Sequence, residues 1–382
     1  MNAHRILASS VLCVLVAQPL GQAGTLVVPV DVPDLQQALD IAPAGTTILV
    51  QGGRWGPLVV TKPVHIVGHP SAFVAGGPGP SGGFRSPITL AGPGSGEVAL
   101  SRIAVGGGAD FFSYESAAAG IQGGGFDRLL VQDCVIDGPQ LNLTLGEYPG
   151  DRGIDITIPL LLLERCRVEP SRPMEFDCAD SGPDGVPAIE STGTVVLLDS
   201  RVRGAGGAVF CQLFGCGAGG IDCPDGGEGG PGVVCDVLYR AASRVAGGQG
   251  ATWIDGETGI DVCCVKADGP AVVARLDVEL AGDLSSSGAL LAGSTWTLRW
   301  NTPGPHALLF AAPGAGTPTL LPAAGVLFLE PTALLSLGVV ASPGSRCFVV
   351  PNEPDLIGQQ VGVQLLDASG QLTRPVFGSV LP

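Results

Sequence analysis

The chain has 382 residues, of which 60 are glycine, 32 are proline and 5% are aromatic, while 45% are hydrophobic. This hydrophobic content argues against a disordered chain, and the many glycines and prolines favour an all-β protein of short strands joined by turns. The formal net charge of 19 − 35 = −16 argues against nucleic acid and anionic membrane surfaces as partners, because both bind basic surfaces.

Residues 1–24 have the pattern of a secretory signal peptide. His4 and Arg5 provide a positive start, Ile6–Ala17 is apolar, and Gly21–Ala23 offers a small-x-small cleavage site. Cys13 lacks the preceding small residue that a lipoprotein signal requires. No later segment is apolar over the length of a membrane span. We therefore expect a secreted or cell-surface protein that is monomeric and has no membrane span.

The next segment, Val32–Ala42, is expected to form a short amphipathic helix. Leu35, Ala38 and Leu39 fall on one face, and Pro33 suits the first helical turn. Such a helix can cover the open end of a sheet, whose unpaired strand edge would otherwise promote aggregation. Two segments are expected to form the first strands after it: Gly45–Trp55 and Val64–Gly68.

An internal repeat follows. Four segments align without gaps, with starts 31, 32 and 34 residues apart: Val98–Val105, Leu129–Ile136, Leu161–Val168 and Val195–Val202. One aligned column holds Leu100, Val131, Leu163 and Leu197. Apolar residues at alternate positions indicate strands with one buried face. A polar pair in each segment, such as Glu164-Arg165, indicates a corner between two strands.

A second register precedes these strands. A small residue, an Ile and a polar residue recur at Gly120–Gln122, Gly153–Asp155, Ala188–Glu190, Gly220–Asp222 and Gly259–Asp261. Each repeat therefore supplies at least two strands, and no helical period separates them. Parallel strands without crossover helices are expected to stack as a solenoid, each turn pairing with the next.

These segments resemble a known superfamily. Leu35–Gly68 resembles the N-terminal cap and first coil of the right-handed parallel β-helix, or pectin-lyase-like, superfamily, and Val98–Val202 is similar to its generic repeat. The resemblance implies a right-handed parallel β-helix over residues 25–280. It implies little about chemistry, because this scaffold carries lyases, hydrolases, adhesins and inert surface proteins.

The repeat does not continue through residues 281–382. Trp296–Trp300, Ala307–Phe310, Val326–Leu329, Arg346–Val350 and Val361–Leu366 are short apolar segments between Pro/Gly turns. They predict a small antiparallel β-sandwich. Val350–Gly358 and Val363-Gln364 resemble a C-terminal β-sandwich module of secreted bacterial proteins. That resemblance implies display, sorting or attachment, and passive packing is the alternative.

An acidic row is the first candidate site. Four carboxylates follow the column isoleucines and should point outward and stack: Asp155, Glu190, Asp222 and Asp261. Like charges at this spacing need a counter-ion in any sheltered site, which could be calcium at Asp155, Glu190 and Asp222, or the neighbouring Arg152. The resemblance implies that in β-helix lyases such carboxylates bind calcium while an arginine or lysine removes the proton. The alternative is that polar residues simply occupy the outer face of a strand.

Cysteines and aromatic residues supply the other candidates. Removal of Cys13 leaves ten cysteines, an even number that favours disulfides in an oxidising compartment. Cys134 and Cys166 share one column one turn apart, which permits either a disulfide or stacked reduced thiols. The other disulfide candidates are Cys178, Cys211, Cys216, Cys223, Cys235, Cys263, Cys264 and Cys347. Phe111, Phe112, Tyr114 and Tyr148 lie in long loops and could stack on sugar rings, or they could cover the coil.

Two functions remain open at this point. The first is a non-catalytic, secreted or surface-associated β-helix protein that binds a polysaccharide or a cell-envelope component. The second is a polysaccharide lyase or glycoside hydrolase that uses the acidic row on an acidic polysaccharide. The three histidines after the signal segment, His65, His69 and His306, are scattered and show no hydrolase motif.

Overall fold

The computed structural model describes residues 24–78, 84–108, 119–140, 152–170, 184–207, 227–251, 266–280, 282–287, 290–316, 318–321 and 324–382. Two compact units divide the chain, with Leu26–Val278 in one and Glu279–Pro382 in the other. Residues 1–23 of the expected signal segment lie outside the described residues. Within these ranges no helix is long and apolar enough to cross a membrane.

The first unit contains the expected short helix, α2 (Leu35–Ile41), near its N-terminal end. Asp34 caps it, because its side chain accepts a hydrogen bond from the backbone N–H of Gln37 at 3.0 Å. Pro33 therefore precedes the cap. The sequence had suggested that Pro33 lies in the first helical turn, and that detail is wrong. Leu35, Ala38 and Leu39 are buried, which confirms the predicted apolar face.

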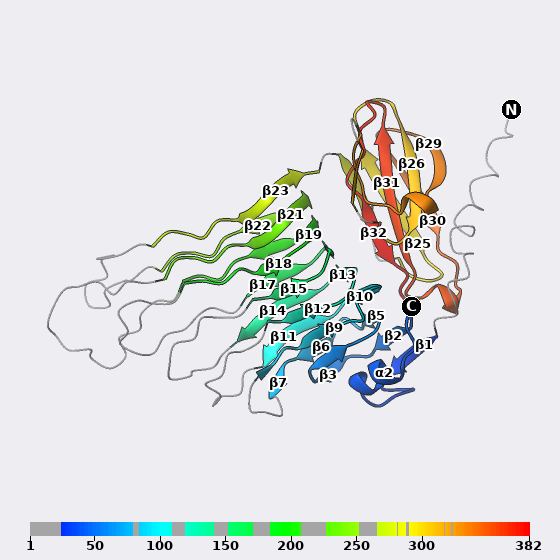
Figure 1. Cartoon of the computed structure of the whole chain (residues 1–382). Coiled ribbons are helices and arrows are strands. Elements are labelled where there is room, and N and C mark those ends of the chain that lie inside the picture. Colours follow the sequence, from blue (N-terminus) through cyan, green and yellow to red (C-terminus); the bar gives the residue numbers. More distant parts are fainter. Residues whose placement is uncertain are drawn as a thin grey trace, which may run out of the picture. The chain divides into compact units, whose positions relative to one another are not determined.

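Parallel strands make up most of the rest of this unit (Figure 1). The largest sheet has 14 strands and contains two ladders. The first ladder consists of β1 (Thr25–Val28), β2 (Thr47–Val50), β5 (His65–Gly68), β10 (Glu97–Ser101), β13 (Arg128–Gln132), β16 (Leu160–Glu164), β19 (Thr194–Leu198) and β21 (Val233–Ala241). The second consists of β4 (Leu58–Val60), β9 (Ile88–Ala91), β12 (Ile121–Gly124), β15 (Ile154–Thr157) and β18 (Ile189–Ser191).

The long strand β21 joins the two ladders. Val233 and Val234 pair with β18, whereas Val237–Ala241 pairs with β19. Strand β23 (Val272–Glu279) also pairs with β21.

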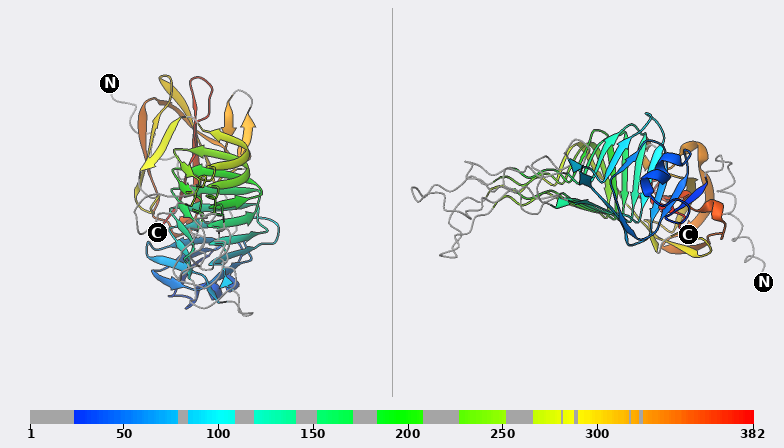
Figure 2. Two further views of the ribbon diagram at one scale, coloured as in Figure 1. Left: turned by 90° about the vertical axis from the view of Figure 1, so that its left-hand side faces the viewer. Right: turned by 90° about the horizontal axis from the view of Figure 1, so that it is seen from below.

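A separate seven-stranded sheet forms a third ladder. It consists of β3 (Gly53–Trp55), β6 (Ala72–Ala75), β11 (Ala104–Gly108), β14 (Val135–Gln140), β17 (Arg167–Glu169), β20 (Arg201–Arg203) and β22 (Arg244–Ala246). Its neighbouring strands all pair in parallel. Figure 2 shows the strands of this unit stacked one upon the next. The small hairpin of β7 (Gly77–Pro78) and β8 (Phe84–Arg85) is antiparallel.

Like residues from successive repeats lie in register, as the alignment predicted. Leu100 pairs with Val131, Val131 with Leu163, and Leu163 with Leu197. A second column runs through Val105, Ile136, Val168 and Val202. All eight side chains are buried in one hydrophobic core. Stacked apolar columns therefore hold the repeats together.

The predicted corners lie where the first ladder leads into the third. Five non-glycine residues at this point have a positive φ between 49° and 57°: Arg102, Asp133, Arg165, Asp199 and Ala242. The left-handed conformation disfavours side chains with a Cβ atom, so its recurrence at one position marks a structural requirement of the corner.

The first ladder departs from the prediction of one buried face. Leu130, Leu162 and Val196 alternate with the core residues, so they face away from the core, yet each is at most 2% exposed. The sequence carried this signal, because β16 reads Leu-Leu-Leu-Leu-Glu without polar alternation. Continuous apolar runs are typical of strands that are buried on both faces.

The second unit contains the expected antiparallel strands. One sheet has the order β24 (Asp283–Ser287), β25 (Thr295–Asn301) and β30 (Gly344–Val349); the other has β29 (Leu335–Ala341), β26 (His306–Pro313), β31 (Gln360–Asp367) and β32 (Val376–Ser379). A hairpin of β27 (Thr319–Leu321) and β28 (Gly325–Leu327) and the short helices η1 (Pro331–Ala333) and η2 (Pro354–Leu356) complete it. Trp296 and Leu298 from one sheet share a core with Leu309 and Leu365 from the other.

Candidate functional site

The second ladder brings two of the predicted carboxylates together. Ile154 and Ile189 are fully buried and in register, so the residues that follow them, Asp155 and Glu190, are neighbours on the outer face of β15 and β18. Gln122 precedes them in the same register on β12. The alternation of Ile and polar residues therefore orients these side chains as predicted.

Arg152 neutralises this pair. Its Nη1 lies 3.2 Å from Oδ2 of Asp155, and its Nε lies 2.5 Å from Oε2 of Glu190. The three side chains are 38–46% exposed. Two carboxylates about 4.8 Å apart repel by roughly 1 kcal/mol in water, and one guanidinium between them offsets that repulsion. Arg152 is thus the counter-ion of the two carboxylates, a role for which calcium was the alternative.

The row does not continue as the sequence suggested. The register partner of Glu190 on the next strand is Val234, not Asp222. Asp222 and Asp261 themselves lie outside the described residues. Val234 thus occupies the position beside Glu190, and the expected places of Asp222 and Asp261 in the row stay predictions. The described residues contain no group of three or more His, Cys, Asp or Glu side chains that could hold a metal ion.

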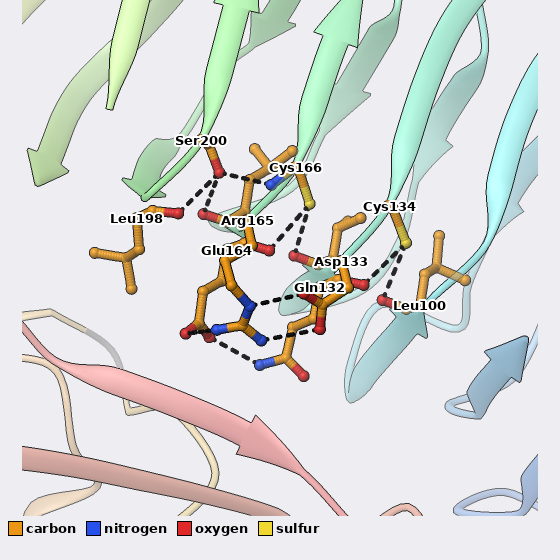
Figure 3. A network of polar contacts seen from close by, with 11 residues as sticks. Leu100, Gln132, Asp133, Cys134, Glu164, Arg165, Cys166, Leu198 and Ser200 are labelled. Atoms are coloured by element: carbon orange, nitrogen blue, oxygen red, sulfur yellow. Dashed lines mark hydrogen bonds and ion pairs between the residues drawn. The ribbon is translucent and has the colours of Figure 1, made fainter. Parts of the chain in front are cut away.

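A second polar network lies at the end of β13 and β16, and sequence reasoning treated its residues only as a corner (Figure 3). Gln132 donates from Nε2 to Oε2 of Glu164 at 2.9 Å, and Nη1 of Arg165 lies 2.5 Å from Oε1 of Glu164. Arg165 also forms a bidentate pair with Asp133, at 2.7 and 2.9 Å. Figure 3 shows Arg165 between the two carboxylates.

Glu164 is the unusual member of this network. Its side chain is 2% exposed, and burial raises its pKa to about 7 although the charge of Arg165 acts in the opposite direction. Two donors hold the carboxylate, so Glu164 is a structural group, and burial brings its pKa close to neutral pH. Leu198 occupies the equivalent position in the next repeat, so the position does not require a charge.

The cysteines of this corner are free thiols. Cys134 and Cys166 do not form a disulfide, and both are buried. The Sγ atom of Cys166 donates to the carbonyls of Glu164 and Val131, at 3.3 Å each. Ser200 does the same one repeat later, since its Oγ donates to Leu198 O at 2.9 Å and to Leu163 O at 3.3 Å. Of the two alternatives, stacked reduced thiols are therefore correct. Their side chains donate hydrogen bonds to backbone carbonyls at the corner.

Cys235 and Cys347 are also free, so four of the ten disulfide candidates are wrong, and no disulfide joins described residues. Burial raises the pKa of Cys166 well above its ordinary value and that of Cys235 to about 12, which disfavours the reactive thiolate. Six candidates lie outside the described residues: Cys178, Cys211, Cys216, Cys223, Cys263 and Cys264. So do the four aromatic candidates: Phe111, Phe112, Tyr114 and Tyr148.

A row of arginines on the third ladder went unnoticed in the sequence. Arg167, Arg201 and Arg244 are in register on β17, β20 and β22, and all three are exposed. The signal was present in the repeat alignment, where Arg167 and Arg201 both stand immediately before the column valine.

Comparison of the chain with protein-family models, with curated proteins and with solved structures found no match.

Proposed function

We propose that this chain is a secreted or surface-associated protein with a right-handed parallel β-helix of the pectin-lyase-like type, and that it binds glycans without transforming them. Three ladders of parallel strands that share one core support the β-helix. The C-terminal unit is an antiparallel β-sandwich that displays or attaches the β-helix. Its two sheets around a common core support this assignment.

One observation carries the preference for binding over catalysis. Asp155, Glu190 and Arg152 are the residues a lyase would use, and they are bound to one another. A proton-abstracting arginine must be free to approach a substrate carbon, whereas Arg152 has its Nε and Nη1 against carboxylates. The carboxylates likewise have their charge offset, which weakens their attraction for a calcium ion.

A glycan array with the purified mature protein tests the proposal. Binding to one class of polysaccharide is the expected result, and the absence of binding to every glycan on the array would remove it. A parallel incubation with acidic polysaccharides and calcium follows the absorbance of unsaturated uronate products. Appearance of that absorbance, and its loss in Arg152→Gln, would establish the lyase alternative instead.

A further inference from the structure

The outer face of the third ladder carries stacked positive charge in a protein whose formal net charge is −16. Arg167, Arg201 and Arg244 are register partners on three consecutive strands. Val168 and Val202 lie in the core, so the arginines that precede them face away from it. Neighbouring strands are about 4.8 Å apart, so the arginines repeat at that interval along the stack.

Arg203 adds a fourth positive charge to this face, two residues after Arg201 on β20. We name Arg167, Arg201, Arg203 and Arg244 the arginine strip. The acidic residues on the same face of the adjoining strands are Asp137 on β14 and Glu169 on β17. The strip therefore has an excess of two positive charges over the described carboxylates of this face.

Three of the four arginines have no ion-pair partner among the described residues. Arg167 has one partner, Asp137, with Nη2 and Oδ1 3.3 Å apart. Arg201, Arg203 and Arg244 form no ion pair with any described residue. Arginines of β21 and β23 behave differently: Arg240 lies 3.0 Å from Asp277, and Arg275 lies 2.9 Å from Asp236.

Repulsion between like charges in register opposes folding, so the strip is not explained by stability. An exposed row of guanidinium groups is suited to oxyanions, because each group presents N–H donors in a planar fork that matches a carboxylate or a sulfate. A ligand with charges on successive units of a linear chain would contact several arginines at once. Each contact would relieve the repulsion between neighbours.

We propose that the arginine strip binds a linear acidic polysaccharide, whose carboxylate or sulfate groups pair with Arg167, Arg201, Arg203 and Arg244. This inference rests on the proposed glycan-binding function, and it names the site and the charge of the ligand. Nucleic acid fits less well, because a chain of net charge −16 repels a dense polyanion outside the short strip. The strip differs from the acidic row, which lies on another ladder.

Binding of the full mature chain to immobilised polygalacturonate, which carries carboxylates, and to heparin, which also carries sulfates, tests the proposal. Dextran is the neutral comparison. The expected result is that Arg201→Gln/Arg244→Gln weakens binding to the preferred acidic polymer at least tenfold and lowers its salt dependence. The matched control is Arg240→Gln/Arg275→Gln, which removes the same charge from the first unit outside the strip and should change affinity less than twofold.

A third variant, Arg201→Lys/Arg244→Lys, keeps the charge and loses the planar fork, so it should bind with intermediate affinity. Thermal unfolding of every variant confirms that it is folded. Acidic-polymer binding that survives Arg201→Gln/Arg244→Gln, or falls equally in the control, would overturn the strip and leave the glycan-binding function intact. Binding to neutral glycans alone would also overturn the strip and leave the glycan-binding function intact. Equal or tighter strip-dependent binding of a DNA duplex would overturn the polysaccharide assignment.

Discussion

The side chain of Gln36 on α2 makes both hydrogen bonds that a neighbouring strand would make with Val59 on β4. Its Oε1 accepts from the Val59 N–H at 2.7 Å, and its Nε2 donates to the Val59 carbonyl at 3.2 Å. Strand β4 is the last strand of its sheet, so Val59 would otherwise present free backbone groups. The helix therefore closes this edge with a side chain.

Replacement of Gln36 by Ala should expose this edge. We expect the free energy of unfolding to fall by about 1 kcal/mol, because two backbone groups lose partners in a partly water-accessible place. Self-association should also increase with protein concentration. Urea denaturation and sedimentation velocity measure the two effects. Gln37→Ala is the matched control, since the Gln37 side chain is exposed on the same helix. Equal behaviour of the two variants would refute this role for Gln36.

Arg152→Gln should separate the electrostatic role of Arg152 from its packing. The substitution leaves Asp155 and Glu190 adjacent without a counter-charge, so stability at pH 7 should fall by about 0.5–1 kcal/mol. Adding Glu190→Gln should restore most of the loss, because only one carboxylate then remains. Chemical denaturation of the two single variants and the double variant gives the coupling energy. Additive effects, with no coupling between the two positions, would contradict the ion-pair account.

The corner thiols should be interchangeable with hydroxyls. Cys166→Ser should change stability by less than about 1 kcal/mol, because Ser200 already makes the equivalent two hydrogen bonds one repeat later. Cys166→Leu should destabilise by about 1–3 kcal/mol through overpacking. In the folded protein, an alkylating reagent should modify Cys347, which is exposed, and spare Cys134 and Cys166. Peptide mapping by mass spectrometry distinguishes these sites. Rapid modification of Cys134 in folded protein would count against the buried ladder.

The repeat columns were predictable because they depend only on local alternation and a nearly constant period. Leu100, Val131, Leu163 and Leu197 satisfy both conditions, and so do Ile154 and Ile189. The same extrapolation placed Ile221 and Asp222 next, but the described register partners of Ile189 and Glu190 are Val233 and Val234, and Asp222 lies outside the described residues. Alternation of apolar and polar residues identifies a strand, but it does not determine the register of that strand with its neighbour.

The polar sites were less predictable than the strands. The sequence indicated only a corner at Glu164, because the burial of both faces of β16 follows from tertiary structure. Two stacked cysteines fit a disulfide as well as a ladder of reduced thiols, and the even number of cysteines expected in a secreted chain favoured the disulfide. Arg167 and Arg201 were aligned in the sequence, but only strand register places Arg244 beside them.

Glu164 should make the stability of the protein depend on pH. Its pKa is about 7 in the folded protein, against an ordinary value of 4.5, so between these values the folded chain binds more protons than the unfolded chain. The contribution of Glu164 to the free energy of unfolding must therefore fall as the pH rises from about 4.5 to 7, by at most about 1.4 kcal/mol per pH unit.

Two substitutions isolate this effect. Glu164→Gln keeps the shape and the possibility of hydrogen bonds, and Glu164→Leu introduces the residue that the next repeat carries at the same register position. Both remove the titrating group, so each variant should gain stability relative to the wild type as the pH rises from 5 to 8. Urea denaturation at four pH values in that interval gives the difference curve. A flat difference for both variants would show that the Glu164 carboxylate has the same proton affinity in the folded and unfolded chain.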